Sequence, residues 1–126
     1  MERLLTEKIR IVLAEDDADQ RQILTRLLEQ VGCTVLCAAS NGVELLTFCE
    51  QHEADVALLD FDMPLLDGLE TAEVLQQRGI PVVLISGLAE SSHLVVDLEP
   101  IATRLFKPVK SEELQKAIQV ALATKS

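Results

Sequence analysis

Two short stretches of this chain carry carboxylates directly after an apolar run. The first stretch holds Glu15, Asp16 and Asp17, and the second holds Asp60 and Asp62. Carboxylates that are packed together repel one another and raise each other's pKa unless a cation neutralises them. Clustered oxygen ligands suit Mg²⁺, which keeps some of its water ligands. If the fold brings the two stretches together, the sequence predicts a site for a divalent metal.

Two further polar residues follow later apolar runs. These are Ser86 and Lys107. A carboxylate beside a metal can attack phosphorus, because the metal and a nearby ammonium offset the charge that keeps an anionic phosphoryl donor away. Lys107 can supply the ammonium, the Ser86 hydroxyl can donate a hydrogen bond to a phosphoryl oxygen, and Gly87 leaves space for the incoming group. These residue types therefore predict phosphoryl transfer to a carboxylate.

The apolar runs themselves predict the sheet that positions these residues. Most runs are continuous, which is typical of strands covered on both faces in a parallel sheet. The predicted strands are Ile9–Ala14, Thr34–Ala38, Val56–Leu59, Val82–Ile85 and Arg104–Phe106. A strand followed by a helix, five times over with right-handed crossovers, gives a doubly wound α/β domain. Ligands of such sheets bind outside the carboxyl ends of the strands, so four strand ends point to one site.

The segments between the predicted strands show the three- and four-residue spacing that is typical of helices. The first predicted helix is amphipathic, and one of its faces is marked, at three- and four-residue spacing, by Gln20, Ile23, Leu24, Leu27, Leu28 and Val31. The last predicted helix has a second such face, made of Leu114, Ala117, Ile118, Ala121 and Leu122. A helix after Gly87 fits Leu94, Val95 and Leu98, although Pro100 should end or kink it.

Start and stop signals mark the other helix boundaries. Asn41 and Glu44 have the spacing of a capping box, which predicts that the second helix begins there. The third helix follows Gly68 and ends near Gly79. Ser111 is predicted to cap the last helix.

Length, composition and charge limit the function classes. With 126 residues, 48% of them hydrophobic, the chain suits a single domain over 1–126 with its core at about 8–124. A net charge of −10 argues against direct nucleic-acid binding. The first residues lack a signal-peptide pattern and no apolar run could span a bilayer, so we expect a cytoplasmic protein without a membrane partner.

The few cysteines and histidines of the chain carry no ligand spacing. Cys33, Cys37 and Cys49 are odd in number and are predicted to be small buried hydrophobes. His52 and His93 are predicted to lie on the surface.

In this order along the chain, the motifs resemble the receiver domain of two-component response regulators, the CheY-like family. The resemblance covers essentially the whole chain and rests on "LAEDD" with Glu15 and Asp16, "LLDFDMPLLDG" with Asp60, "LISG" with Ser86, and "FKP" with Lys107. It implies a flavodoxin-like (βα)5 fold whose five-stranded parallel sheet has the order 2-1-3-4-5.

The resemblance also implies a chemical role for each site residue. Asp60 would be the phosphoacceptor, with Ser86 as the switch hydroxyl and Lys107 as the neighbouring ammonium, in a step that depends on Mg²⁺ (or Mn²⁺). Asp16 and Asp60 would bind the metal through side chains, Glu15 mainly through water, and Asp62 through its backbone carbonyl. Asp17 is left over and is read as a surface residue near the first helix. The Lys107-Pro108 bond is often cis in this family.

The resemblance further implies partners. The phosphoryl group would come from a sensor histidine kinase or a histidine phosphotransfer protein. Phosphorylation would switch the surface around the fourth predicted helix, the fifth strand and the last helix for a downstream effector protein or domain, and a phosphorylation-dependent homodimer is an option. The domain would not be an enzyme beyond phosphorylating itself from small donors and dephosphorylating itself. Only "TKS" follows the last helix, which fits a stand-alone receiver or a segment of a longer protein.

Three features depart from the family pattern or bear on how long the phosphoryl group lasts. Arg104 stands three residues before Lys107, where many receivers have an aromatic switch residue. The stretch "EPIATRLF" replaces a common small-residue turn before the fifth strand. Asp62 and Leu88 occupy positions that resemble gatekeepers for the water that hydrolyses the aspartyl phosphate, and their side chains predict a long-lived phosphoryl state.

Two alternatives stay open at this point. Asp60 and Asp62 also resemble the Asp-x-Asp of haloacid dehalogenase-like phosphatases, although there the acidic pair follows the Lys and a Gly-Thr usually follows the motif. The chain also has no room for a cap domain. The other alternative is a pseudo-receiver, an interaction module with the same fold that is not phosphorylated.

Overall fold

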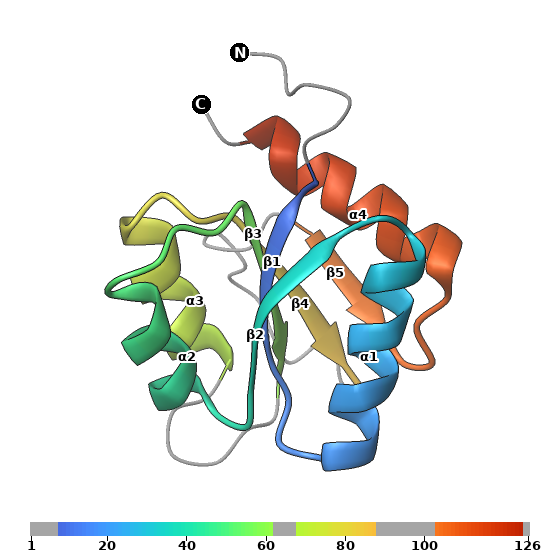
Figure 1. The fold of residues 1–126 in the computed structure, drawn as a ribbon, viewed down its shortest axis with the longest axis horizontal. Coiled ribbons are helices and arrows are strands. Elements are labelled where there is room, and N and C mark those ends of the chain that lie inside the picture. The colour runs from blue at the N-terminus through green and yellow to red at the C-terminus, as the bar shows by residue number, and fades with distance from the viewer. Residues whose placement is uncertain (1–7, 62–67, 88–102, 125–126) are drawn as a thin grey trace.

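The five strands form one parallel sheet with helices on both faces (Figure 1). The structure is a computed structural model that describes residues 8–61, 68–87 and 103–124. The strands are β1 Arg10–Ala14, β2 Thr34–Ala39, β3 Val56–Asp60, β4 Val82–Ser86 and β5 Thr103–Phe106. The helices are α1 Ala18–Gln30, α2 Gly42–Cys49, α3 Gly68–Gln77 and α4 Ser111–Thr124. The strand order is β2-β1-β3-β4-β5, which confirms the predicted fold class.

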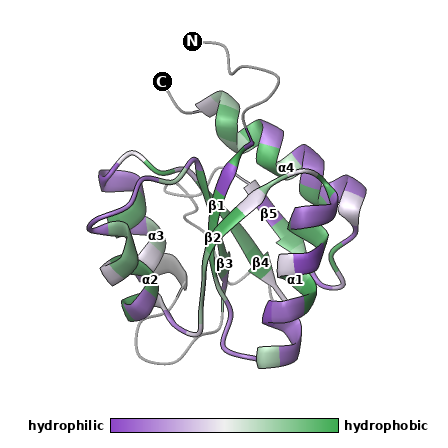
Figure 2. Ribbon diagram, viewed as in Figure 1, coloured by the Kyte–Doolittle hydropathy of each residue, from purple (hydrophilic) through white to green (hydrophobic). Residues whose placement is uncertain are grey.

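The sheet separates two apolar layers. Because side chains of a strand alternate between its faces, Val12 packs with the layer under α2 and α3, whereas Leu13 packs with the layer under α1 and α4. Every residue of β3 and β4 is buried, as the continuous apolar runs predicted. The green surfaces of the helices in Figure 2 turn toward the sheet, and their purple residues turn outward. Because the buried strands are parallel, their carboxyl ends come together at one edge of the sheet.

Strand β2 lies at one edge of the sheet and departs from the continuous pattern. Its residues alternate in exposure, and its register against β1 skips one residue, so that Val35 pairs with Ile11 and Cys37 with Val12. Leu36 is the extra residue of this bulge and is 36% exposed. Bulges increase local twist and interrupt pairing, which protects an open edge strand from a second chain.

The free thiols behave as small hydrophobes, as predicted. Cys33 and Cys49 are buried, and Cys37 is partly buried. Burial raises the pKa of each of these thiols, so the reactive thiolate is disfavoured at neutral pH.

Helix boundaries agree with the sequence at two places and differ at one. Asn41 caps α2, since its Oδ1 accepts the Glu44 N–H at 2.8 Å. Gly79, just past α3, has φ +82, a left-handed conformation that favours glycine after a helix. The prediction that Ser111 caps the last helix is wrong by one residue. Ser111 is already helical, and the Lys110 carbonyl accepts the Leu114 N–H.

The apolar face predicted for α1 is too wide. Leu24 and Leu28 are buried and Leu27 and Val31 pack against them, but Ile23 is 51% exposed. One helix lying on a sheet buries a narrow stripe, and Ile23 stands at the edge of that stripe.

Several predictions fall on residues outside the described ones. These are the helix after Gly87, together with the positions of Asp62, Leu88 and His93. His52 is described and is exposed, as predicted, with its ring stacked on Phe48 at a centroid distance of 4.0 Å.

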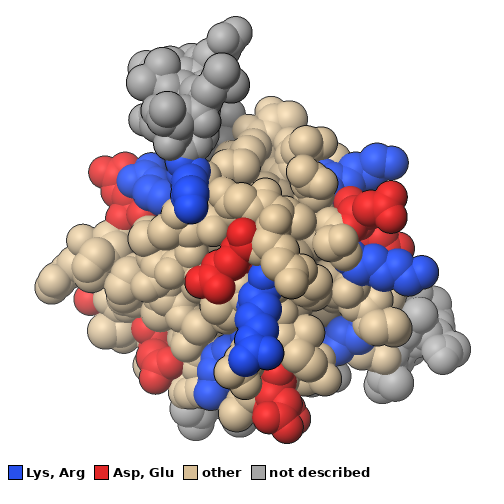
Figure 3. Space-filling view, turned by 45° about the vertical axis from the view of Figure 1, so that its right-hand side comes forward, with Lys and Arg blue, Asp and Glu red and all other residues tan. Residues whose placement is uncertain are grey.

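Charges of both signs alternate over the face shown in Figure 3, where Lys and Arg stand among Asp and Glu. None of the helices in the described segments has the length and apolar character needed to cross a membrane.

Candidate functional site: an acidic cluster at the carboxyl edge of the sheet

Three carboxylates meet where β1 and β3 end. Glu15 and Asp16 follow β1 directly, and Asp60 is the last residue of β3, which lies beside β1 in the sheet. One oxygen from each carboxylate lies within 4.8 Å of the others. Glu15 is 1% exposed and Asp60 is 6% exposed, whereas Asp16 faces solvent. The structure thus brings together the two acidic stretches that the sequence singled out.

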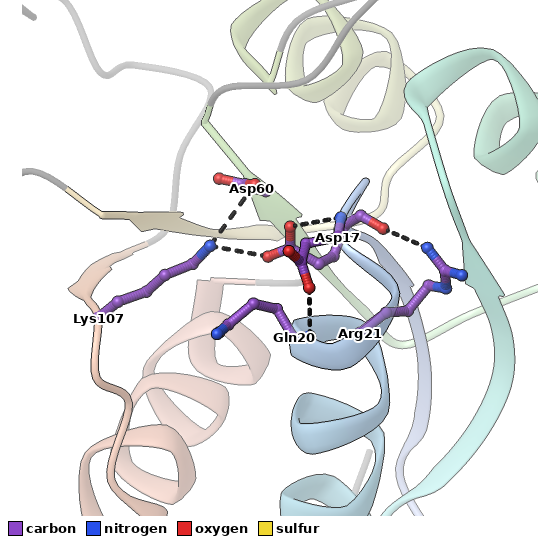
Figure 4. Close-up of polar contacts among 6 residues, drawn as sticks. Asp17, Gln20, Arg21, Asp60 and Lys107 are labelled. Carbon is purple, nitrogen blue, oxygen red and sulfur yellow. Dashed lines mark hydrogen bonds and ion pairs between the residues drawn. The ribbon is translucent and has the colours of Figure 1, made fainter.

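Lys107 reaches this cluster from the end of β5 (Figure 4). Its Nζ donates a hydrogen bond to Glu15 Oε1 at 2.8 Å and lies 3.6 Å from Asp60 Oδ2. The Lys107-Pro108 peptide bond is cis, as the resemblance implied. The ammonium therefore bridges two carboxylates, and the shorter contact is with Glu15 rather than with Asp60.

The ion pair shifts the pKa of both partners toward their charged forms. Burial alone raises the pKa of Glu15, but hydrogen bonds with Lys107, Asp60 and the Asp17 backbone, together with the Lys107 charge, bring it below its usual value. Burial likewise lowers the pKa of Lys107, but Glu15 and Asp60 outweigh it and raise that pKa. At neutral pH the pair is therefore charged.

Asp17 caps helix α1 and is not one of the three clustered carboxylates. Its Oδ1 accepts the Gln20 N–H at 2.9 Å, which makes Asp17 the N-cap of α1. Its own N–H donates to Glu15 Oε2 at 3.2 Å. The predicted surface position is confirmed, but the capping role was missed, although an Asp directly before a helix is a sequence signal for it.

Ser86 ends β4 at the same edge of the sheet. Its side chain is buried, with the residue 2% exposed, and β4 lies beside β3 so that Asp60 pairs with Ile85. A Cβ on Gly87 would lie 3.9 Å from Lys107 Cδ, so glycine leaves the side of the Lys107 stem open. Asp62, predicted to offer its backbone carbonyl, lies outside the described residues.

The chemistry of the donor set fits a hard divalent cation. The cluster offers carboxylate oxygens only, two of them buried in the fold and one at the solvent boundary. Oxygen ligands with access to water suit Mg²⁺, whereas zinc sites of proteins are rich in His and Cys. Glu15, Asp16 and Asp60 are the residues that could hold such an ion.

Arg104 lies on β5, three residues before Lys107, and has an unusual environment. It pairs with Leu84 in the sheet, and its guanidinium carbon lies 5.2 Å from the centroid of the Phe106 ring. Phe106 in turn pairs with Ser86. Arg104 Nε is buried and makes no hydrogen bond within the described segments of the chain.

Comparison with known proteins connects this geometry to a family. The family model described as "Response regulator receiver domain" matches residues 11–119. The chain is 32% identical over 118 residues to a probable C4-dicarboxylate response regulator of Priestia megaterium, covering 86% of this chain and 50% of the relative. It is 37% identical over 114 residues to a positive alginate biosynthesis regulatory protein of Pseudomonas aeruginosa, covering 88% of this chain and 46% of the relative. The chain thus spans about half the length of these relatives.

Solved structures share the fold. A response regulator receiver domain protein from Clostridium thermocellum superposes with a TM-score of 0.80 at 27% identity, over 93% of this chain and 96% of that one. The receiver domain of a sensor histidine kinase from Pseudomonas aeruginosa superposes with a TM-score of 0.81 at 23% identity, over 93% of this chain and 99% of that one. In the latter structure a magnesium ion is coordinated in the active-site cleft.

Proposed function

This chain belongs to the response regulator receiver domain family, and from that membership we propose that Asp60 is its phosphoacceptor. The donor is the phosphohistidine of a sensor histidine kinase or of a histidine phosphotransfer protein. The observation that carries the proposal is the position of Lys107, whose ammonium lies 3.6 Å from Asp60 and 2.8 Å from Glu15 within a cluster of three carboxylates.

The transfer forms one bond and breaks another. A carboxylate oxygen of Asp60 attacks phosphorus, and the P–N bond to the imidazole of the donor breaks. The phosphoimidazole of the donor carries a proton on its other ring nitrogen, so when the imidazole keeps the electron pair of the P–N bond it leaves as neutral histidine. Lys107 offsets the negative charge of the phosphoryl oxygens as they approach Asp60, and the Ser86 hydroxyl donates a hydrogen bond to one of them.

A divalent cation, Mg²⁺ or Mn²⁺, belongs to this proposal. Asp16 and Asp60 would hold it through their side chains, Glu15 mainly through water, and Asp62 through its backbone carbonyl. When bound, the ion would neutralise part of the charge on the incoming phosphoryl group. The magnesium in the Pseudomonas aeruginosa neighbour supports this choice of ion.

The test is phosphorylation by a small acyl-phosphate donor, followed by intact mass. The parent should gain one phosphoryl group in Mg²⁺ and none in chelator. Asp60→Asn should gain none, because an amide is a poor nucleophile. Asp19→Asn is the matched control, since Asp19 is an exposed carboxylate of α1 and should leave labelling intact. Stoichiometric labelling of Asp60→Asn at another residue would remove Asp60 from the role.

The partners and location also belong to this proposal, since the relatives extend beyond the matched region. A downstream effector protein or domain would recognise the surface of β5, α4 and the segment after Gly87, and phosphorylation could promote a homodimer. We expect no direct nucleic-acid contact, a cytoplasmic location and no enzymatic turnover beyond the domain's own phosphoryl group. The family match favours this reading over a haloacid dehalogenase-like phosphatase, and labelling of Asp60 would separate it from a pseudo-receiver.

A further inference from the structure

Arg21 holds the loop that carries Glu15 and Asp16. It projects from the first turns of α1, and its Nη1 donates a hydrogen bond to the Glu15 carbonyl at 2.8 Å. In Figure 4 Lys107 and Arg21 lie on opposite sides of Asp17. The Arg21 side chain thus contacts the backbone of the acidic stretch and not its carboxylates.

Glu15 is fixed by contacts at each of its polar groups. Its N–H donates to the Ala39 carbonyl at 3.0 Å, its Oε1 accepts from Lys107, and its Oε2 accepts the Asp17 N–H. Its carbonyl oxygen accepts from Arg21. The connection between β1 and α1 is therefore tied to β2 on one side and to α1 on the other.

From this arrangement we infer that Arg21 is a positioning residue for the metal site. By holding the Glu15 carbonyl, Arg21 fixes the direction in which the chain leaves β1, and so the positions of the Glu15 and Asp16 carboxylates relative to Asp60. Mg²⁺ demands near-octahedral geometry. A site whose loop is free to move therefore binds Mg²⁺ more weakly, even when every ligand is present. The inference rests on the metal-dependent function proposed above.

Charge and positioning predict opposite signs for the loss of Arg21, which makes the inference testable. A guanidinium near three carboxylates repels an incoming cation, so removing its charge alone should tighten Mg²⁺ binding. Removing the hydrogen bond to Glu15 should loosen the loop and weaken binding. A weaker affinity in a neutral variant therefore cannot come from the change in net charge.

The experiment compares Arg21→Met, Arg21→Lys and Arg26→Met with the parent. Arg26 lies on the same helix and is exposed, so Arg26→Met makes the same change in charge without the Glu15 contact. Mg²⁺ affinity is measured by calorimetry and by Mg²⁺-induced amide shifts in chelator-treated protein. We expect Arg21→Met to weaken binding about tenfold, the lower end of what outer-shell partners of metal sites contribute. Arg21→Lys, which keeps a charged donor, should recover part of the loss, and Arg26→Met should bind as tightly as the parent or slightly more tightly.

A second readout separates positioning from a direct role in chemistry. In labelling by an acyl-phosphate donor, Arg21→Met should need more Mg²⁺ for half-maximal rate and should approach the parent rate at saturation. A reduced rate at saturating Mg²⁺ with an unchanged half-saturation point would overturn the inference.

The possible failures can be told apart. If neither the parent nor Arg26→Met binds Mg²⁺, the proposed metal-dependent function fails. If the parent binds and Arg21→Met binds equally well or more tightly, only the role of Arg21 fails. If Arg21→Met does not fold, as judged by circular dichroism, Arg21→Lys decides alone. Its charge is unchanged, so weaker Mg²⁺ affinity than the parent would support positioning, and parent-like affinity would refute it.

Discussion

Replacing Lys107 by Met removes the ammonium that bridges two carboxylates while keeping most of the aliphatic stem. Lys107 Nζ lies 2.8 Å from Glu15 Oε1 and 3.6 Å from Asp60 Oδ2. At an effective dielectric constant of about 20, the shorter contact alone corresponds to about 6 kcal/mol of Coulomb attraction. Most of that attraction is offset by the cost of taking the ions out of water.

The cost of protonating a carboxylate limits how much unfolding free energy Lys107→Met can lose. When Lys107 is absent, a buried carboxylate can be protonated instead of staying charged. At pH 7 this costs a carboxyl group of ordinary pKa 4.5 about 3.4 kcal/mol. Lys107→Met should therefore lower the free energy of unfolding by about 2–3 kcal/mol at pH 7 in metal-free buffer, slightly less than the usual cost of breaking a buried pair.

The direction of the pH dependence follows from the two pKa shifts. Burial raises the pKa of Glu15, but its hydrogen bonds and the Lys107 charge lower it overall. The contribution of Glu15 to the free energy of unfolding is therefore present above pH 4.5 and is lost as pH falls through the lowered pKa. Burial lowers the pKa of Lys107, but Glu15 and Asp60 raise it overall. The contribution of Lys107 to the free energy of unfolding is therefore present below pH 10.5 and is lost as pH rises through the raised pKa. In the variant, protonation becomes cheaper as pH falls, so the difference from the parent should shrink toward zero near pH 5.

Urea unfolding followed by far-ultraviolet circular dichroism measures the effect. The parent, Lys107→Met and Lys110→Met are compared in chelator at pH 7 and pH 5, and Lys110→Met is the control because Lys110 is exposed. Parent-like stability of Lys107→Met at pH 7 would refute the view that this ammonium offsets the buried carboxylates. A loss of equal size at both pH values would instead assign the effect to packing of the stem.

The remaining predictions concern the metal, the switch and the lifetime of the phosphoryl group. Mg²⁺ at ten times its dissociation constant should stabilise the parent by about 1.4 kcal/mol in thermal unfolding, and Asp16→Ala should lose most of that gain; a melting temperature indifferent to millimolar Mg²⁺ would count against the site. A phosphoryl mimic should shift amide signals of β5 and α4 as well as those of the cluster, and Arg104→Leu should confine the shifts to the cluster; equal spread in parent and variant would exclude Arg104 from the readout. The double variant Leu88→Glu with Asp62→Asn should lose its phosphoryl group about tenfold faster in Mg²⁺ buffer without kinase, about 1.4 kcal/mol of barrier; decay at the parent rate would end the gatekeeper assignment.

Asp60, Ser86 and Lys107 could be placed from the sequence because one rule covers all three. A continuous apolar run that ends on a polar residue predicts a buried parallel strand, and parallel strands bring their carboxyl ends to one edge. The structure adds one detail, since Asp60 and Ser86 are the last residues of β3 and β4 rather than the first residues after them.

Arg21 and Ile23 show what the sequence could not supply. The hydrogen bond from Arg21 depends on the path of the loop over residues 15–17 and on the reach of a long side chain, and neither leaves a periodic signal. Ile23 fits the spacing of an apolar face, but how wide a stripe α1 buries depends on how the helix lies on the sheet. The Ser111 boundary differs for a similar reason, because a backbone carbonyl at Lys110 accepts the bond expected of a side chain.

The charges of Glu15, Asp16 and Asp60 suggest why the Arg104 guanidinium on β5 matters for the proposed phosphorylation switch. Glu15, Asp16 and Asp60 carry three negative charges against the single ammonium of Lys107, so a divalent ion would bring the cluster close to neutrality. Under the proposed function, phosphorylation would replace the charge of Asp60 with that of a phosphoryl group, which carries about −1.5 to −2, and would leave an excess of negative charge. Arg104 lies on β5 two residues before Phe106, the residue paired with Ser86, and its buried Nε–H has no acceptor among the residues that the structure describes. A buried donor without an acceptor is costly, so we expect the added negative charge of a phosphoryl group to draw the guanidinium away from the Phe106 ring. An aromatic residue at this position could respond only by changing its packing, whereas Arg104 can respond to the charge itself.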